Sequence, residues 1–119
     1  MGYAAKLLPK VVEELDKLLK EIEEKSKEND LVLVYLQTKE LWNVYEAACD
    51  SNEIGTLRSD PIRPEIKTLL MRAKEAADKF PDRNDESVLK VKTLVEDAES
   101  YERRWAARRN ELQPTARFN

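Results

Sequence analysis

The chain has 119 residues, of which 38% are charged and 41% hydrophobic, and its formal net charge is −3. It contains no histidine, which excludes an imidazole base and a histidine metal ligand. Because domains usually run to about 100–200 residues, we expect a single helical-bundle domain over 1–119, with 113–119 as a loosely ordered tail. The near-neutral total charge favours neither nucleic acid nor a membrane surface as the partner.

Glycine is scarce, since the chain has only two against an average usage near 7%. All-β proteins need many turns in which glycine supplies positive φ angles, whereas helices need few. Strong helix formers such as Ala, Leu, Glu, Lys and Arg dominate the composition. The sequence therefore predicts an all-α fold, a four-helix bundle with helices at about 8–27, 30–50, 64–80 and 85–112.

The first two predicted helices, 8–27 and 30–50, differ in how much apolar surface they carry. In the first, apolar residues recur every three or four positions among acidic ones, and Pro9 suits the first turn, where its missing N–H costs nothing. The second is hydrophobic almost all round, because further apolar residues widen its stripe: Val32, Leu33, Leu36 and Val44. We expect it to be the most buried helix, with a homodimer as one way to cover its spare face.

The last two predicted helices, 64–80 and 85–112, are separated by a short break. This break is Pro-Asp-Arg-Asn-Asp at 81–85, which ends one helix and caps the next. We therefore expect an antiparallel hairpin. At roughly 1.5 Å per residue the last helix spans about 42 Å, against about 30 Å for the first. Its C-terminal end should therefore project beyond the rest of the bundle.

The projecting end of the last helix carries the candidate partner-binding residues: Arg103, Arg104, Trp105, Arg108 and Arg109. From 103 to 117 there are five basic residues and one acidic residue. Arg104 and Arg108 share a helix face, which suits bidentate binding of carboxylate or phosphate, and Trp105 adds a stacking surface. Three interpretations are open. The end is solvated and complements the helix dipole or meets the acidic first helix, or it binds a protein, or it binds nucleic acid or lipid phosphate.

Three other motifs carry weaker chemical signals. The stretch 50–61 begins like an EF-hand calcium loop, but Ile54 and Pro61 occupy positions that need oxygen ligands. The Pro-x-x-Pro pattern at 61–64 matches a polyproline ligand, although the start of a helix explains it more simply. Cys49 has no histidine to activate it and is expected in the core. A single thiol also fits a reducing, intracellular location, cytoplasmic or nuclear.

The segment 69–99 contains Lys-Phe-Pro-Asp at 79–82 and Leu-Val-Glu-Asp-Ala-Glu at 94–99. In these residues it resembles the PLU-1-like helical linker of the JmjC/ARID/PHD histone demethylases. Such linkers string helical hairpins together, with a proline-containing break before a helix. The resemblance implies a helical scaffold within a chromatin enzyme, and it transfers no catalytic or metal residue to this chain.

No sequence pattern indicates catalysis, a metal or a cofactor, because the chain has no glycine-rich phosphate loop and no Glu-x-x-His pair. We therefore expect a non-catalytic protein–protein interaction or scaffold module of the adaptor, linker or inhibitor type. We expect no membrane span, a monomer or homodimer, and a protein partner rather than nucleic acid. The alternatives are a binder of nucleic acid or another phosphate-bearing surface through the arginines, and a small enzyme with a buried carboxylate pair.

Overall fold

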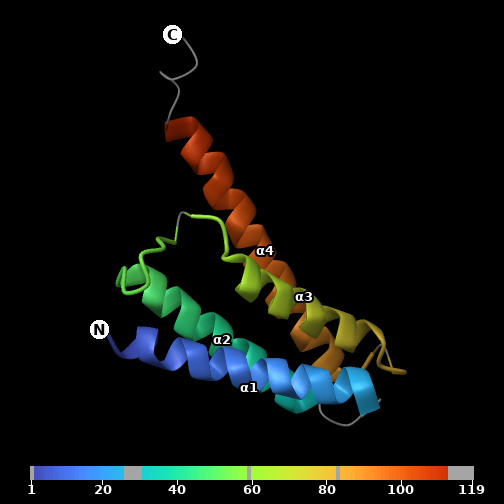
Figure 1. Cartoon of the computed structure of the whole chain (residues 1–119). Coiled ribbons are helices and arrows are strands. Elements are labelled where there is room, and N and C mark those ends of the chain that lie inside the picture. Colours follow the sequence, from blue (N-terminus) through green and yellow to red (C-terminus); the bar gives the residue numbers. More distant parts are fainter. Residues whose placement is uncertain (1, 26–30, 59, 83, 113–119) are drawn as a thin grey trace.

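The computed structural model describes residues 2–25, 31–58, 60–82 and 84–112, and of residues 25, 105, 106 and 108–112 it describes the backbone alone. Within these ranges lie four α-helices: α1 (Tyr3–Lys25), α2 (Leu31–Asp50), α3 (Pro64–Asp78) and α4 (Glu86–Leu112) (Figure 1). The described residues include no strand, so the predicted all-α four-helix bundle is confirmed. None of the helices in this part of the chain is both long and apolar enough to cross a membrane.

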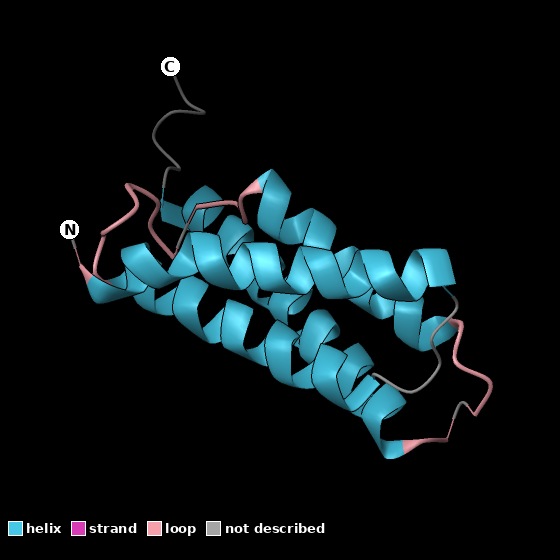
Figure 2. Cartoon of the chain, turned by 60° about the horizontal axis from the view of Figure 1, so that its bottom comes forward, coloured by secondary structure: helices cyan, strands magenta, loops and turns pink. Residues whose placement is uncertain are grey.

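The four helices pack as two antiparallel hairpins, α1 with α2 and α3 with α4. Between the hairpins, α1 lies along α3 and α2 lies along α4, and each of these pairs runs in the same direction (Figure 1). The connection 51–63 therefore joins diagonally opposite helices. It crosses one end of the bundle, where the start of α1 also lies, and the α3–α4 turn lies at the other end (Figure 2).

The apolar stripes of the four helices meet in one continuous core. Each stripe repeats at three- and four-residue spacing, so each helix turns one face inward. The largest apolar side chains with almost no exposed surface are Leu15, Leu19, Leu41, Ile66, Leu70, Val34, Val88, Val91 and Val95. Because full burial of such a side chain contributes about 1.5–3 kcal/mol, this core fixes the positions of the helices and of the residues on their outer faces.

Helix α1 begins at Tyr3 rather than near residue 8, so the predicted placement of Pro9 in the first turn is wrong. Pro9 lies inside the helix, where it has no N–H to donate to the carbonyl of Ala5. Two contacts support the residues before it: Leu8 is buried in the core, and the Glu53 carboxylate accepts a hydrogen bond from the Ala5 N–H at 3.4 Å. A carboxylate at this end also complements the helix dipole. The predicted helix end at residue 27 lies outside the described residues, as does the tail 113–119.

Helix α2 is predicted to be the most buried helix, and among the described side chains it has more buried residues than any other helix. Part of its apolar surface is nevertheless uncovered. Val32, Leu33 and Leu36 are 59%, 41% and 53% exposed. The reason is that α2 occupies a corner of the bundle between α1 and α4, so its outer side faces no other described helix. The polar Thr38, in contrast, is fully buried in the same helix.

The hairpin of α3 and α4 forms as predicted, with a small difference at the end of α3. This helix ends at Asp78 rather than at residue 80. The reason is that the ring of Pro81 disfavours helical backbone at the residue before it. Phe80 still packs partly against the core. At the start of α4, Asp85 caps the helix by accepting a hydrogen bond from the Ser87 N–H at 2.8 Å. The predicted break therefore both stops one helix and caps the next.

Candidate functional site: the basic end of helix 4

The predicted binding residues all lie near the C-terminus of α4, where this helix projects beyond the start of α3 (Figure 1). We call residues 103–109 the basic end. Arg103 and Arg104 are exposed, as expected. The side chains of Trp105, Arg108 and Arg109 lie outside the described part of the chain. The structure therefore gives the helical backbone of the predicted site and the placement of its first two arginines.

Tyr101 joins the basic end to the rest of the bundle. The guanidinium groups of Arg104 and Arg58 lie 5.5 Å and 5.4 Å from the centre of its ring. At these distances each cation is attracted to the π face of the ring. Arg103 approaches the Glu99 carboxylate, one turn back along α4, at 4.0 Å. These contacts orient Arg103 and Arg104 along the helix surface while both remain exposed.

Arg58 holds the connection 51–63 against the bundle, although no sequence pattern marks it. Its guanidinium donates to Asp50 and lies 3.4 Å from Glu46, both in the last turns of α2. Burial alone would lower its pKa, but Tyr101 and the two carboxylates favour the charged form, and the net pKa is raised. Arg58 therefore stays cationic and ties the connection to α2 and α4. Asp50, which opens the calcium-loop-like stretch, is engaged in this ion pair.

Glu102 anchors the second half of the connection. Its carboxylate accepts a hydrogen bond from the Ile62 N–H at 2.7 Å, and its other oxygen lies 3.0 Å from the Lys67 ammonium. Ile62 is buried, and Pro64 begins α3. The N–H groups of Ile62 and Arg63 are bonded to Glu102 and Tyr45, so the Pro-x-x-Pro stretch is held against the bundle, although both prolines are exposed. Glu102 directly precedes the basic end, and it therefore fixes the point at which α4 leaves the bundle.

Cys49 is a buried residue beneath the connection, as predicted. Burial raises the pKa of its thiol, and burial also raises the pKa of the neighbouring Tyr45 to about 12. The Tyr45 hydroxyl accepts a hydrogen bond from the Arg63 N–H at 3.1 Å. The cavity lined by Tyr45, Cys49 and Arg58 has a volume of about 10 Å³, which is room for a single water molecule. A protonated thiol beside so small a cavity has the character of a core residue rather than of a nucleophile.

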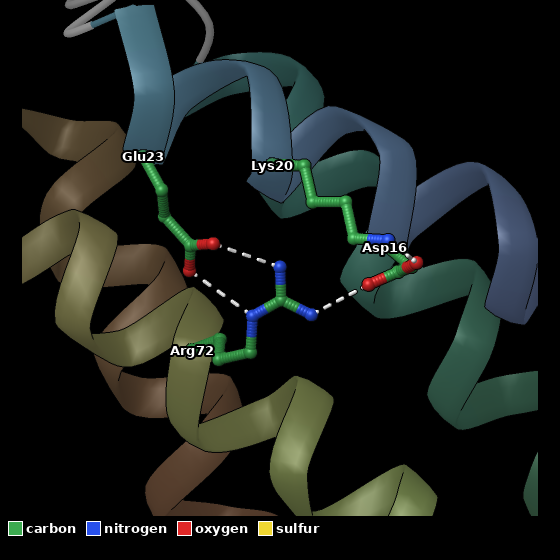
Figure 3. Close-up of polar contacts among 4 residues, drawn as sticks. All are labelled: Asp16, Lys20, Glu23 and Arg72. Carbon is green, nitrogen blue, oxygen red and sulfur yellow. Dashed lines mark hydrogen bonds and ion pairs between the residues drawn. The ribbon is translucent and has the colours of Figure 1, made fainter.

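Arg72 of α3 neutralises part of the acidic surface of α1, because it pairs with Asp16 and Glu23 (Figure 3). Arg72 Nη1 lies 2.7 Å from Asp16 Oδ1, while Nε and Nη2 donate to the two Glu23 oxygens at 3.0 and 2.9 Å. Lys20 also reaches Asp16 at 3.2 Å. The hydrogen bonds from Arg72 are the main reason why the pKa of each carboxyl group is lowered. Among the described side chains the arginine that meets α1 is therefore Arg72, whereas Arg103 and Arg104 contact their own helix.

Across the described residues, no group of three or more Cys, Asp and Glu side chains is placed to hold a metal ion. Two further hollows are open grooves, one between Tyr35 of α2 and the outer side of α4 and one beside the start of α3. Comparison with protein-family models, with curated proteins and with solved structures finds no match. The function therefore has to be inferred from the surface of this chain itself.

Proposed function

We propose that this chain is a non-catalytic protein–protein interaction or scaffold module that binds an acidic partner protein through the basic end of α4. The observation that carries the proposal is the exposure of Arg103 and Arg104 on a helix that extends beyond its neighbours (Figure 1). A projecting helix offers most of its circumference to a partner, whereas a helix inside the bundle offers only its outer strip.

The charge distribution supports an acidic partner. Residues 103–117 contain five basic residues and one acidic residue, whereas 13–30 contain four basic and eight acidic residues. Arginine presents a planar fork of donors that binds carboxylates in a bidentate manner. Asp16 and Glu23 of α1 are already paired with Arg72. These two carboxylates therefore do not need the arginines of the basic end as partners.

Two further considerations bear on the choice of partner. The resemblance of 69–99 to a demethylase linker implies a scaffold role of the same kind, and it stays a prediction.

The competing proposal is that the same arginines bind nucleic acid or another phosphate-bearing surface. The net charge of −3 and the acidic α1 disfavour it, since nucleic-acid-binding domains usually carry a basic total charge.

The double variant Arg104→Glu with Arg108→Glu tests the proposal. The partner is identified by crosslinking in the native source, purified, and titrated calorimetrically against the wild-type chain and the variant. We expect the affinity to fall at least tenfold, which corresponds to about 1.4 kcal/mol. The melting temperature should change little, because both positions lie in the last three turns of α4 and Arg104 is exposed.

The matched control is Lys10→Glu with Lys17→Glu, which makes the same change in total charge at two exposed positions of α1. It should bind the partner normally. An unchanged affinity of the Arg104→Glu, Arg108→Glu variant would overturn the assignment of the basic end. An oligonucleotide affinity that falls steeply between about 50 and 200 mM salt, and that the double variant loses, would favour the phosphate-binding alternative.

A further inference from the structure

A second exposed surface lies where the N-terminal halves of α2 and α4 run side by side. One face of α2 consists of residues at i, i+3, i+4 and i+7, which are neighbours on a helix surface: Val32, Tyr35, Leu36 and Lys39. Val32 and Leu36 are 59% and 53% exposed, and Leu89 in the first turn of α4 is 53% exposed. We call Val32, Tyr35, Leu36 and Leu89 the apolar face.

Tyr35 connects the two helices of the apolar face. The Lys90 ammonium of α4 lies 5.5 Å from the centre of its ring, and that of Lys39 lies 5.9 Å from it. Tyr35 and Leu89 also line one open groove of about 320 Å³. Single exposed apolar residues are ordinary on protein surfaces, but these residues are brought together by the packing of two helices and form one surface.

The charged residues around the apolar face are of both signs. Lys39 and Lys90 supply positive charge, and Glu86 and Asp97, which line the same groove, supply negative charge. Lys90 and Glu86 pair with each other at 3.0 Å within α4, so the rim as a whole is close to neutral. A two-fold symmetric contact places a surface against a copy of itself, so the surface has to be complementary to itself. An apolar centre meets this condition, and a rim without a large excess of one sign avoids repulsion between the two copies. The apolar face has both. A strongly acidic or strongly basic partner would instead meet as many like charges as opposite ones.

We propose that the apolar face binds a second copy of this chain and so forms a two-fold symmetric dimer. A stable interface buries about 800 Å² on each partner, which is more than four side chains provide, so the charged rim takes part as well. Leu89 precedes Arg103 by roughly four helical turns, about 21 Å along α4. Each basic end therefore lies outside the apolar face of its own chain, and a partner with two acidic sites would gain avidity from a dimer in which both ends stay accessible.

Light scattering on gel-filtered protein tests the proposal. The chain has a mass of 13.8 kDa, and we expect twice this mass for the wild-type protein in the micromolar range. Leu36→Glu and, separately, Leu89→Glu place a charge in the centre of the interface and should give the monomer mass at the same concentrations. Glutamate is a good helix former, and circular dichroism verifies that each variant remains helical.

The matched control is Met71→Glu, because Met71 is 40% exposed on α3 and lies outside the apolar face. This variant should remain dimeric. A wild-type chain that keeps the monomer mass at every concentration overturns the proposal. The apolar face would then be a binding surface for a different protein. A dimer that neither Leu36→Glu nor Leu89→Glu weakens overturns it equally.

The same variants test the proposed dimer and the proposed role of the basic end independently of each other. The Arg104→Glu, Arg108→Glu variant should stay dimeric, and Leu36→Glu should retain the affinity of a single basic end for the acidic partner. Failure of one proposal therefore does not imply failure of the other.

Discussion

Thr38 is a polar side chain in the middle of an apolar core. It is fully buried, and its hydroxyl oxygen has no hydrogen-bond partner in the described structure. On the same buried side of α2 lie Val34 and Leu41, both without exposed surface. A buried polar group without a partner has lost its hydrogen bonds to water and gained none in the protein, which lowers the free energy of unfolding by about 1–3 kcal/mol. The hydroxyl of Thr38 is thus a local weakness in the core.

We predict that Thr38→Val raises the free energy of unfolding by about 1–2 kcal/mol. Valine has nearly the same shape as threonine but lacks the hydroxyl, so the packing is kept and the unpaired polar atom is removed. Urea unfolding followed by circular dichroism measures the change. The control Thr68→Val replaces an exposed threonine on α3 and should stay within about 0.5 kcal/mol of the wild type. A loss of stability in Thr38→Val would show that the hydroxyl makes a bond.

Between elements, Arg72 links α3 to α1 through Asp16 and Glu23 (Figure 3). The pKa values of both carboxyl groups are lowered from the ordinary values of 3.8 and 4.5. Groups whose pKa is lowered on folding stabilise the protein above their unfolded pKa and lose that contribution as the pH falls through the folded one. The link therefore acts fully at pH 7 and fades in acid. Because the acids are partly exposed, solvent limits its total contribution to about 1 kcal/mol.

We predict that Arg72→Met lowers stability at pH 7 by about 1 kcal/mol, and that this difference from the wild type shrinks as the pH is lowered from 7 to 3. Methionine keeps the aliphatic packing and removes the donors. Thermal unfolding at a series of pH values measures the difference. Lys74→Met on the same helix is the control, since Lys74 makes no ion pair among the described residues. A difference that is constant with pH would mean that Arg72 acts through packing alone.

The elements were predictable from the sequence wherever the signal is local. Apolar spacing predicted four helices, and the cap at Asp85 follows from the residues beside it. The start of α1 was not predictable, because Glu53, 48 positions along the chain from Ala5, supports the residues before Pro9. The sequence shows that α2 has apolar residues on most of its surface. Which of them are exposed depends on how the other helices pack around α2, and composition does not encode this packing.

The candidate site was predictable to a similar degree. The projection of α4 followed from helix lengths alone, and the exposure of Arg103 and Arg104 followed from that projection. The stacking of Arg58 and Arg104 on Tyr101 did not, because it depends on the path that the connection 51–63 takes across the bundle. Contacts between distant segments require the three-dimensional arrangement.

At the scale of the whole molecule, the two proposed surfaces lie on different parts of the bundle. The basic end is at the C-terminus of α4, whereas the apolar face includes the first turn of the same helix. Arg72 meanwhile neutralises part of α1 from within the chain. The core holds these features at fixed distances, so the two proposed interactions, with an acidic protein and with a second copy, would use separate parts of one rigid body.

The connection 51–63 also divides the molecule into two halves that each keep their own anchor. A cut between Arg58 and Pro61 would leave Arg58 bonded to Asp50 in the first half, and Ile62 bonded to Glu102 in the second. Each half would be a helical hairpin with an uncovered apolar side, which the other half covers in the intact chain. We expect fragments 1–59 and 60–119, mixed in equal amounts, to show more helical circular dichroism than the sum of the two alone. If no helix is gained on mixing, the halves depend on being joined, and the connection is needed to assemble the core.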